Sequence, residues 1–169
     1  MVGTKTKTHA PSSRPERHDR LLKELDHDPY HSKVKLKEPT RCPECGAVFA
    51  RGRWSWGDAP ADARAHSCPA CQRIKDRVPA AFLSVRGDFF AAHRDEILHL
   101  IENYEQRERM EHPLKRIMDR ESIDDGVMIS FTDAHLARGI GKALHDAYEG
   151  DVEFQYAKED IMLRVDWVR

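Results

Sequence analysis

Two closely spaced cysteine pairs constrain this chain more than any other feature of its 169 residues. The sequence CPEC at 42–45 and the sequence CPAC at 68–71 contain all four cysteines, and 22 residues separate the two pairs. Two residues between cysteines let both sulfurs of a tight turn reach one ion, and Gly46 relieves the backbone after the first pair. We therefore predict a single closed, tetrahedral metal site held by the thiolates of Cys42, Cys45, Cys68 and Cys71.

Zinc is the metal predicted for this site. Four thiolates suit a structural zinc ion, and little else in the chain suggests the electron transfer for which proteins use iron. Two disulfides are the alternative, but residues 1–37 hold no hydrophobic segment of signal-peptide type, which argues against secretion into an oxidising compartment. With four thiols available, His66 is expected to be solvated.

The charges divide unevenly along the chain, although 28 basic and 29 acidic side chains leave a net charge of only -1. Residues 1–41 carry a net +4 and residues 42–78 a net +2, whereas residues 79–169 carry a net -7. A basic front half next to an acidic back half indicates a polyanionic partner for the front. No apolar run approaches the roughly 18 residues of a membrane span, so no membrane partner is expected.

Composition and pattern predict three parts: a mostly disordered basic tail at 1–40, a four-cysteine zinc ribbon at 41–78 and an α+β domain at 79–169. The tail lacks the apolar residues that would offset chain entropy, apart from a short helix predicted at 17–25. In the α+β domain, apolar periodicity predicts a strand at 81–85, a helix from Asp88 to Pro113, strands at 114–118 and 127–131, a helix closed by Gly150, and a hairpin of 152–156 with 161–167. The order β-α-β-β-α-β-β predicts a ferredoxin-like domain with one additional strand.

A candidate nucleic-acid surface lies between the cysteine pairs, where arginines alternate with aromatic residues. Side chains of this kind suit phosphate contact and base stacking, and they are Arg51, Arg53, Trp54 and Trp56. The alternative is that the tryptophans cover the metal site, and at least one is expected to do so. Two further pairs could extend the basic surface: Arg73 with Lys75, and Arg138 with Lys142 on the second helix. For the latter pair, a solvated helix face is the favoured alternative.

No catalytic motif can be argued from the sequence. The segment GIGK at 139–142 looks like the end of a phosphate loop, but Leu136 stands where such a loop needs glycine and Ala143 where it needs serine or threonine. We expect these glycines instead to let a helix approach its sheet. No nucleophile arrangement or small-molecule site is apparent, so a non-enzymatic protein is predicted.

Two segments together resemble a known family. The segment CPECGAV at 42–48 with GRW at 52–54, and ISF at 129–131 followed by AHLARGI at 134–140, are similar to the zinc-ribbon region and the next domain of the adaptor that escorts the large ribosomal subunit out of the nucleus, and of its archaeal relatives. The resemblance covers residues 42–169 and extends to short bacterial proteins built from the same two parts. It implies the ribosome or ribosomal RNA as the partner.

The departures from this family shape the expected role. The family usually has more CxxC pairs, and its later domains and nuclear-export segments have no counterpart here. We therefore expect a cytoplasmic, ribosome-associated factor that acts in stress or dormancy, and not an export adaptor. Two alternatives stay open: a DNA-binding transcription regulator that uses the ribbon and the basic tail, and an enzyme with an unrecognised site on the acidic domain.

Overall fold

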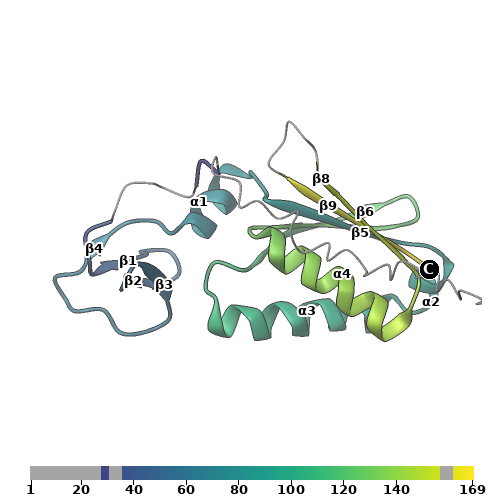
Figure 1. The fold of residues 1–169 in the computed structure, drawn as a ribbon, viewed down its shortest axis with the longest axis horizontal. Coiled ribbons are helices and arrows are strands. Elements are labelled where there is room, and N and C mark those ends of the chain that lie inside the picture. Colours follow the sequence, from purple (N-terminus) through teal and green to yellow (C-terminus); the bar gives the residue numbers. More distant parts are fainter. Residues whose placement is uncertain (1–27, 31–35, 157–161) are drawn as a thin grey trace, which may run out of the picture.

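The structure, a computed structural model, describes residues 28–30, 36–156 and 162–169 of the chain. These ranges form an α+β fold with two mixed sheets and four helices (Figure 1). A small part that contains the cysteines lies beside a larger part that contains the long helices. Most of the predicted tail, including its short helix at 17–25, lies outside the described residues.

The small part, called the metal module here, is a four-stranded sheet followed by one helix. Its elements are β1 (Thr40–Arg41), β2 (Val48–Ala50), β3 (Arg53–Ser55), β4 (Arg64–Ala65) and α1 (Pro69–Asp76). The strand order is β3-β2-β1-β4, with β1 and β4 parallel and the other pairs antiparallel. Arg51 and Gly52 join β2 to β3 with φ angles of 55° and 74°, as a tight two-residue hairpin turn requires.

The larger part, called the α+β domain, has five strands and three helical segments. Its elements are β5 (Ala81–Arg86), α2 (Asp88–Ala92), α3 (Arg94–Glu111), β6 (Ile117–Ile123), β7 (Gly126–Phe131), α4 (Ala134–Tyr148), β8 (Asp151–Tyr156) and β9 (Leu163–Val168). The strand order is β6-β7-β5-β9-β8. Helices α3 and α4 lie on the same face of this sheet (Figure 1).

The additional strand occupies an internal position of the sheet. Strand β7 is antiparallel to both β5 and β6, so β5 and β6 run parallel with β7 between them. Strand β9 pairs in parallel with β5 and antiparallel with β8, which separates β8 from β5. The predicted element order is therefore observed, with the first helix divided at His93 and β9 inserted between β5 and β8.

Alternating apolar residues of the three central strands form the core of the α+β domain. In β5 the buried residues Ala81, Leu83 and Val85 alternate with side chains on the opposite face, and β7 and β9 repeat the pattern. The helices add apolar side chains at helical spacing, all fully buried: Phe90, Ile97, Ile101, Leu136, Ile140 and Leu144. Each such side chain contributes about 1.5–3 kcal/mol relative to exposure, so this core stabilises the domain independently of the cysteines.

Helix α4 approaches its neighbours through two glycines. Asp133 caps the helix by accepting a 2.8 Å hydrogen bond from the Leu136 backbone N–H. A Cβ at Gly141 would lie 2.7 Å from Cγ1 of Val165 in β9, and a Cβ at Gly139 would meet the Tyr104 hydroxyl of α3. The glycines of the GIGK segment therefore permit close packing within a helix, as expected.

One predicted strand was wrong in its first three residues. The pattern predicted a strand at 114–118, whereas β6 begins at Ile117. Leu114 packs against the buried core of the metal module, and Arg116 is buried beside the cysteines, so both side chains serve the contact between the two parts. In the described part of the chain, no helix is long and apolar enough to cross a membrane.

Candidate metal centre

The first cysteine pair lies on a tight turn that follows β1. The backbone N–H of Cys42 donates to the carbonyl of Ala47 over 2.8 Å, and the N–H of Gly46 donates back to the carbonyl of Cys42 over 2.9 Å. Gly46 has a φ of 80°, a conformation that favours glycine. These bonds turn the sulfurs of Cys42 and Cys45 toward the same side, as the spacing predicted.

The second pair begins a helix, which the sequence analysis did not predict. Cys68 is the N-cap of α1, Pro69 lies in the first turn, and the Cys71 N–H donates to the Cys68 sulfur over 3.4 Å. The Cys68 N–H donates in turn to the Cys42 sulfur over 3.3 Å. The positive end of a helix and two backbone N–H groups therefore face the sulfurs, and both favour the thiolate form.

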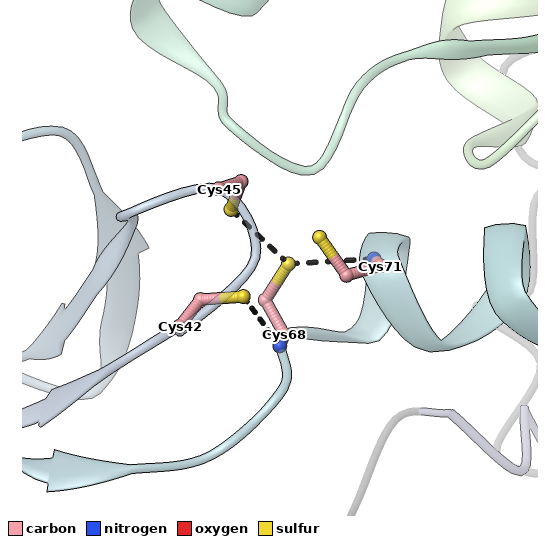
Figure 2. Close-up of side chains that lie close together, drawn as sticks. All are labelled: Cys42, Cys45, Cys68 and Cys71. Atoms are coloured by element: carbon pink, nitrogen blue, oxygen red, sulfur yellow. Dashed lines mark hydrogen bonds between the residues drawn. The ribbon is translucent and has the colours of Figure 1, made fainter.

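The four sulfurs lie close enough together to hold one metal ion. All four lie within 4.8 Å of one another, and the sulfurs of Cys45 and Cys68 are 3.7 Å apart (Figure 2). Metal–sulfur bonds of about 2.3 Å in a tetrahedron place the sulfurs about 3.8 Å apart. All four cysteines are free, and 3.7 Å is far longer than the roughly 2.05 Å of a disulfide. The geometry and the donor set therefore fit one tetrahedral metal ion.

Burial divides the four ligands into two kinds. Cys42 and Cys68 are fully buried, whereas Cys45 and Cys71 are partly exposed. Burial, aided by a contact with Glu44, raises the pKa of the Cys42 thiol to about 11, and burial also raises the pKa of Cys68. Burial acts on Cys45 in the same direction, but the Ala47 N–H and a nearby guanidinium outweigh it and lower the pKa of Cys45 to about 7. The inner sulfurs therefore hold their protons more firmly than Cys45 does.

That guanidinium belongs to Arg116, a residue of the site that sequence reasoning missed. Arg116 lies in the loop between α3 and β6, is 6% exposed, and donates through its two terminal nitrogens to the sulfurs of Cys71 (3.3 Å) and Cys68 (3.6 Å). Although burial opposes it, hydrogen bonding with Cys71 and Cys45 raises the pKa of Arg116. Nothing in the local sequence marks this arginine, because its partners are more than 40 residues away.

The two tryptophans between the cysteine pairs have different surroundings. Trp54 packs against the buried core of the metal module and lies beside the Phe49 ring, with centroids 5.6 Å apart. This confirms that at least one tryptophan covers the metal site. Trp56 is 37% exposed, and its indole N–H donates to the Arg109 carbonyl of α3 over 2.6 Å, which joins the module to the α+β domain.

Arg51 and Arg53 are exposed at the end of the β2–β3 hairpin. The Glu38 carboxylate accepts hydrogen bonds from the backbone N–H groups of Arg51 and Gly52 over 2.7 and 2.8 Å. The turn therefore has a fixed backbone, while the Arg51 side chain extends from it without using its guanidinium to hold the turn.

The other predicted contact residues lie elsewhere. Arg73 is buried: its guanidinium lies 2.5 Å from the Asp28 carboxylate and 4.4 Å from the centre of the Tyr30 ring. Its place in the structure therefore serves to hold residues 28–30 against α1. Lys75, on the same helix, is exposed.

Helix α4 carries the last predicted pair, in the α+β domain. Arg138 lies over the ring of Phe154 at 5.9 Å, and Lys142 is exposed. His66, expected to be solvated, is exposed and lies outside the cysteine cluster. The structure thus brings together the four cysteines, Trp54 and Arg116.

Comparison with known proteins finds no family model that matches the chain, and no curated protein matches it either. The resemblance of residues 42–169 to the ribosomal export adaptor family therefore stays a prediction from the motifs.

Proposed function

We propose that this chain is a non-enzymatic zinc protein that binds ribosomal or other structured RNA through its metal module. The observation that carries the proposal is the pair of exposed arginines, Arg51 and Arg53, on a hairpin of the same module that the four cysteines hold together. A cytoplasmic, ribosome-associated factor is the role that fits this partner.

Zinc is the metal that the ligand set favours. Tetrahedral sites with four thiolates take zinc or iron, and structural zinc sites of this kind leave no open position for a substrate or a catalytic water. Cys42 and Cys68 are fully buried within the module, which also suits a structural ion. The closed site supports a role in folding the module and not in catalysis.

The shape of the hairpin supports RNA as the partner. Glu38 fixes the backbone of the turn, so the side chains of Arg51 and Arg53 leave the module from defined positions. A rigid basic turn can contact phosphates, while the exposed part of the Trp56 ring offers a surface for base stacking. Arg73 and Trp54 are left out of this surface, because one is ion-paired with Asp28 and the other packs on the module core.

Sequence motifs in both parts of the chain support the ribosome as the proposed partner. We treat residues 79–169 as a ferredoxin-like domain with β9 inserted between β5 and β8. The resemblance at 42–54 and 129–140 joins both parts of the chain to a family that binds the large ribosomal subunit. Arg138 and Lys142 on α4 are the candidates for a second contact.

Sedimentation of cell lysate through a sucrose gradient tests the proposal. The wild-type chain should migrate with ribosomes, and Arg51→Ala/Arg53→Ala should shift it toward the top of the gradient. Arg94→Ala/Arg107→Ala is the matched control, because it removes two exposed arginines from the α+β domain. Wild-type protein found only at the top of the gradient would contradict the ribosomal partner.

Salt dependence separates phosphate contacts from other modes of binding. In binding assays with purified ribosomes, each phosphate contact contributes about 0.7–0.9 to the slope of log affinity against log salt. The double variant of Arg51 and Arg53 should therefore lower the slope by about 1.4–1.8, and the control should leave it unchanged. Wild-type binding that is insensitive to salt would refute the phosphate contacts.

A further inference from the structure

Arg116 is the contribution of the α+β domain to the metal centre. The four cysteines all belong to the metal module, whereas Arg116 lies between α3 and β6 and reaches two of the sulfurs across the contact between the two parts. Its Nε donates to the Pro113 carbonyl over 2.8 Å, so all three guanidinium nitrogens have a partner. The planar group is thereby held in one orientation against the sulfurs.

A buried guanidinium needs an opposite charge. Arg116 stays charged at any physiological pH, and an unpaired buried charge is strongly unfavourable. Among the described residues, no carboxylate lies within ion-pair distance of Arg116; the nearest acceptors are the Pro113 carbonyl and the sulfurs. Four thiolates around a divalent cation carry a net charge of -2, so the loaded centre supplies the missing negative charge.

We propose that Arg116 is a positioning residue of the metal centre, and that it couples metal loading to the local stability of the junction between β7 and α4 in the α+β domain. Its two N–H groups orient the sulfurs of Cys68 and Cys71 and offset part of the negative charge of the loaded site. Outer partners of this kind typically affect metal affinity by about 10–100-fold. The inference rests on the metal-binding part of the proposed function and is independent of RNA.

The backbone of Arg116 provides the connection to the α+β domain. Its N–H donates to the Thr132 hydroxyl over 2.8 Å, and its carbonyl accepts from the Thr132 N–H over 3.0 Å. Thr132 follows the last residue of β7 and precedes Asp133, the cap of α4. One residue thus joins the metal ligands to the junction between β7 and α4.

A direct phosphate contact is a poorer role for Arg116. An open groove of about 560 Å³ beside the cysteines includes Arg116 in its lining, together with Lys75, Arg109 and Glu44. The guanidinium nitrogens are already engaged, and both Glu44 and the thiolates carry negative charge into the groove. A phosphate there would be repelled by the groups that hold Arg116 in place.

Cobalt(II) titration of the full chain tests the inference, because the sulfur-to-cobalt charge-transfer absorption reports the sulfurs directly. Hydrogen bonds lower the energy of sulfur lone pairs, so Arg116→Met should move this absorption to longer wavelength and weaken Co²⁺ binding about 10–100-fold in chelator competition. Arg116→Lys keeps the positive charge but lacks the planar guanidinium that donates to two sulfurs, so its absorption wavelength and Co²⁺ affinity should be intermediate. Arg120→Met is the matched control, since Arg120 pairs with Glu102 and contacts no cysteine.

Hydrogen exchange tests the coupling. In the wild type, removal of the metal should speed exchange at the Arg116 and Thr132 amides, whereas in Arg116→Met the exchange of the Thr132 amide should no longer depend on metal. Wild-type absorption and affinity in both Arg116 variants would overturn the inference, and if Arg116→Met fails to fold, wild-type values in Arg116→Lys suffice to do so. A wild-type chain that binds no Co²⁺ would instead refute the metal site itself.

Discussion

Removal of the metal should unfold the metal module and leave the α+β domain folded. The buried core of the module is small: it consists of Cys42, Ala47, Cys68 and Ala70, and two of these residues are ligands. The core of the α+β domain is a separate and larger cluster that includes Leu83, with no cysteine among its buried residues. We therefore expect a metal ion bound by the four cysteines to be the main stabilising interaction of the module.

The magnitude follows from the number of ligands. A structural zinc ion bound by four protein ligands contributes about 10–16 kcal/mol to folding near pH 7, which is comparable to the whole stability of a typical small domain, about 5–15 kcal/mol. A loss of about 10 kcal/mol changes the folding equilibrium by about seven powers of ten. Without metal, the unfolded module should therefore be the dominant form.

Hydrogen exchange after chelation measures this effect amide by amide. The amides of Cys42, His66 and Gln72 donate to backbone carbonyls within the module, and each should exchange at the rate of an unstructured chain once the metal is removed. The amide of Leu83 in the central strand β5 should keep its protection. If the module amides stay protected in protein shown by elemental analysis to be metal-free, the reasoning is refuted.

Three further predictions concern packing, pH and the contact between the two parts. Gly141→Ala should lower the free energy of unfolding by about 1 kcal/mol in chemical denaturation. Overpacking against Val165 destabilises the fold by roughly 1–3 kcal/mol, whereas the higher helix propensity of alanine stabilises it by about 1 kcal/mol. An increase in stability would contradict the close packing. Metal affinity from chelator competition should fall at least about a hundredfold for each unit of acidification between pH 8 and 6. Burial raises the pKa of Cys42 to about 11 and also raises the pKa of Cys68, so each of these thiols releases a proton when the metal binds. A metal affinity that does not depend on pH would be inconsistent with this. Trp56→Phe should cost about 0.5–1.5 kcal/mol in thermal unfolding, because it removes the hydrogen bond to α3, and unchanged stability would argue against that contact.

The sequence allowed the local elements of the α+β domain to be predicted because one face of its sheet is buried. Ala81, Leu83 and Val85 alternate because only that face meets the helices, and this period of two is visible in the chain. Asp133 and Gly150 delimit α4 by capping chemistry that acts within a few residues. These signals are local, so single-sequence reasoning could find them.

The pairing of strands could not be predicted in the same way. The alternation in Leu163, Val165 and Trp167 shows which side chains are buried but not which strand lies beside β9. The start of β6 was misplaced for a related reason. Leu114 is apolar because it packs against the metal module, a contact distant in sequence that a local pattern attributes to a strand.

The candidate site was predictable only as far as its ligands. Cysteine spacing identified the four sulfurs, because metal chemistry constrains that spacing directly. Arg73 was predicted to extend the basic surface and Arg116 was not singled out at all. Both side chains are buried, because each has a partner far along the chain: Asp28 for Arg73 and the cysteines for Arg116. Helix α1 escaped prediction although Cys68 and Pro69 form a cap and a first turn, because the cysteine pattern was interpreted as a second tight turn.

The metal content of the purified chain tests the central claim most directly. Elemental analysis of protein purified without added metal should find one zinc ion per chain, and Cys68→Ser should lose it, because that serine replaces a fully buried ligand. The matched control Ser67→Ala removes a hydrogen bond to Glu44 but none of the four sulfurs, and it should keep the ion. Purified wild-type protein that contains neither zinc nor iron would contradict the account.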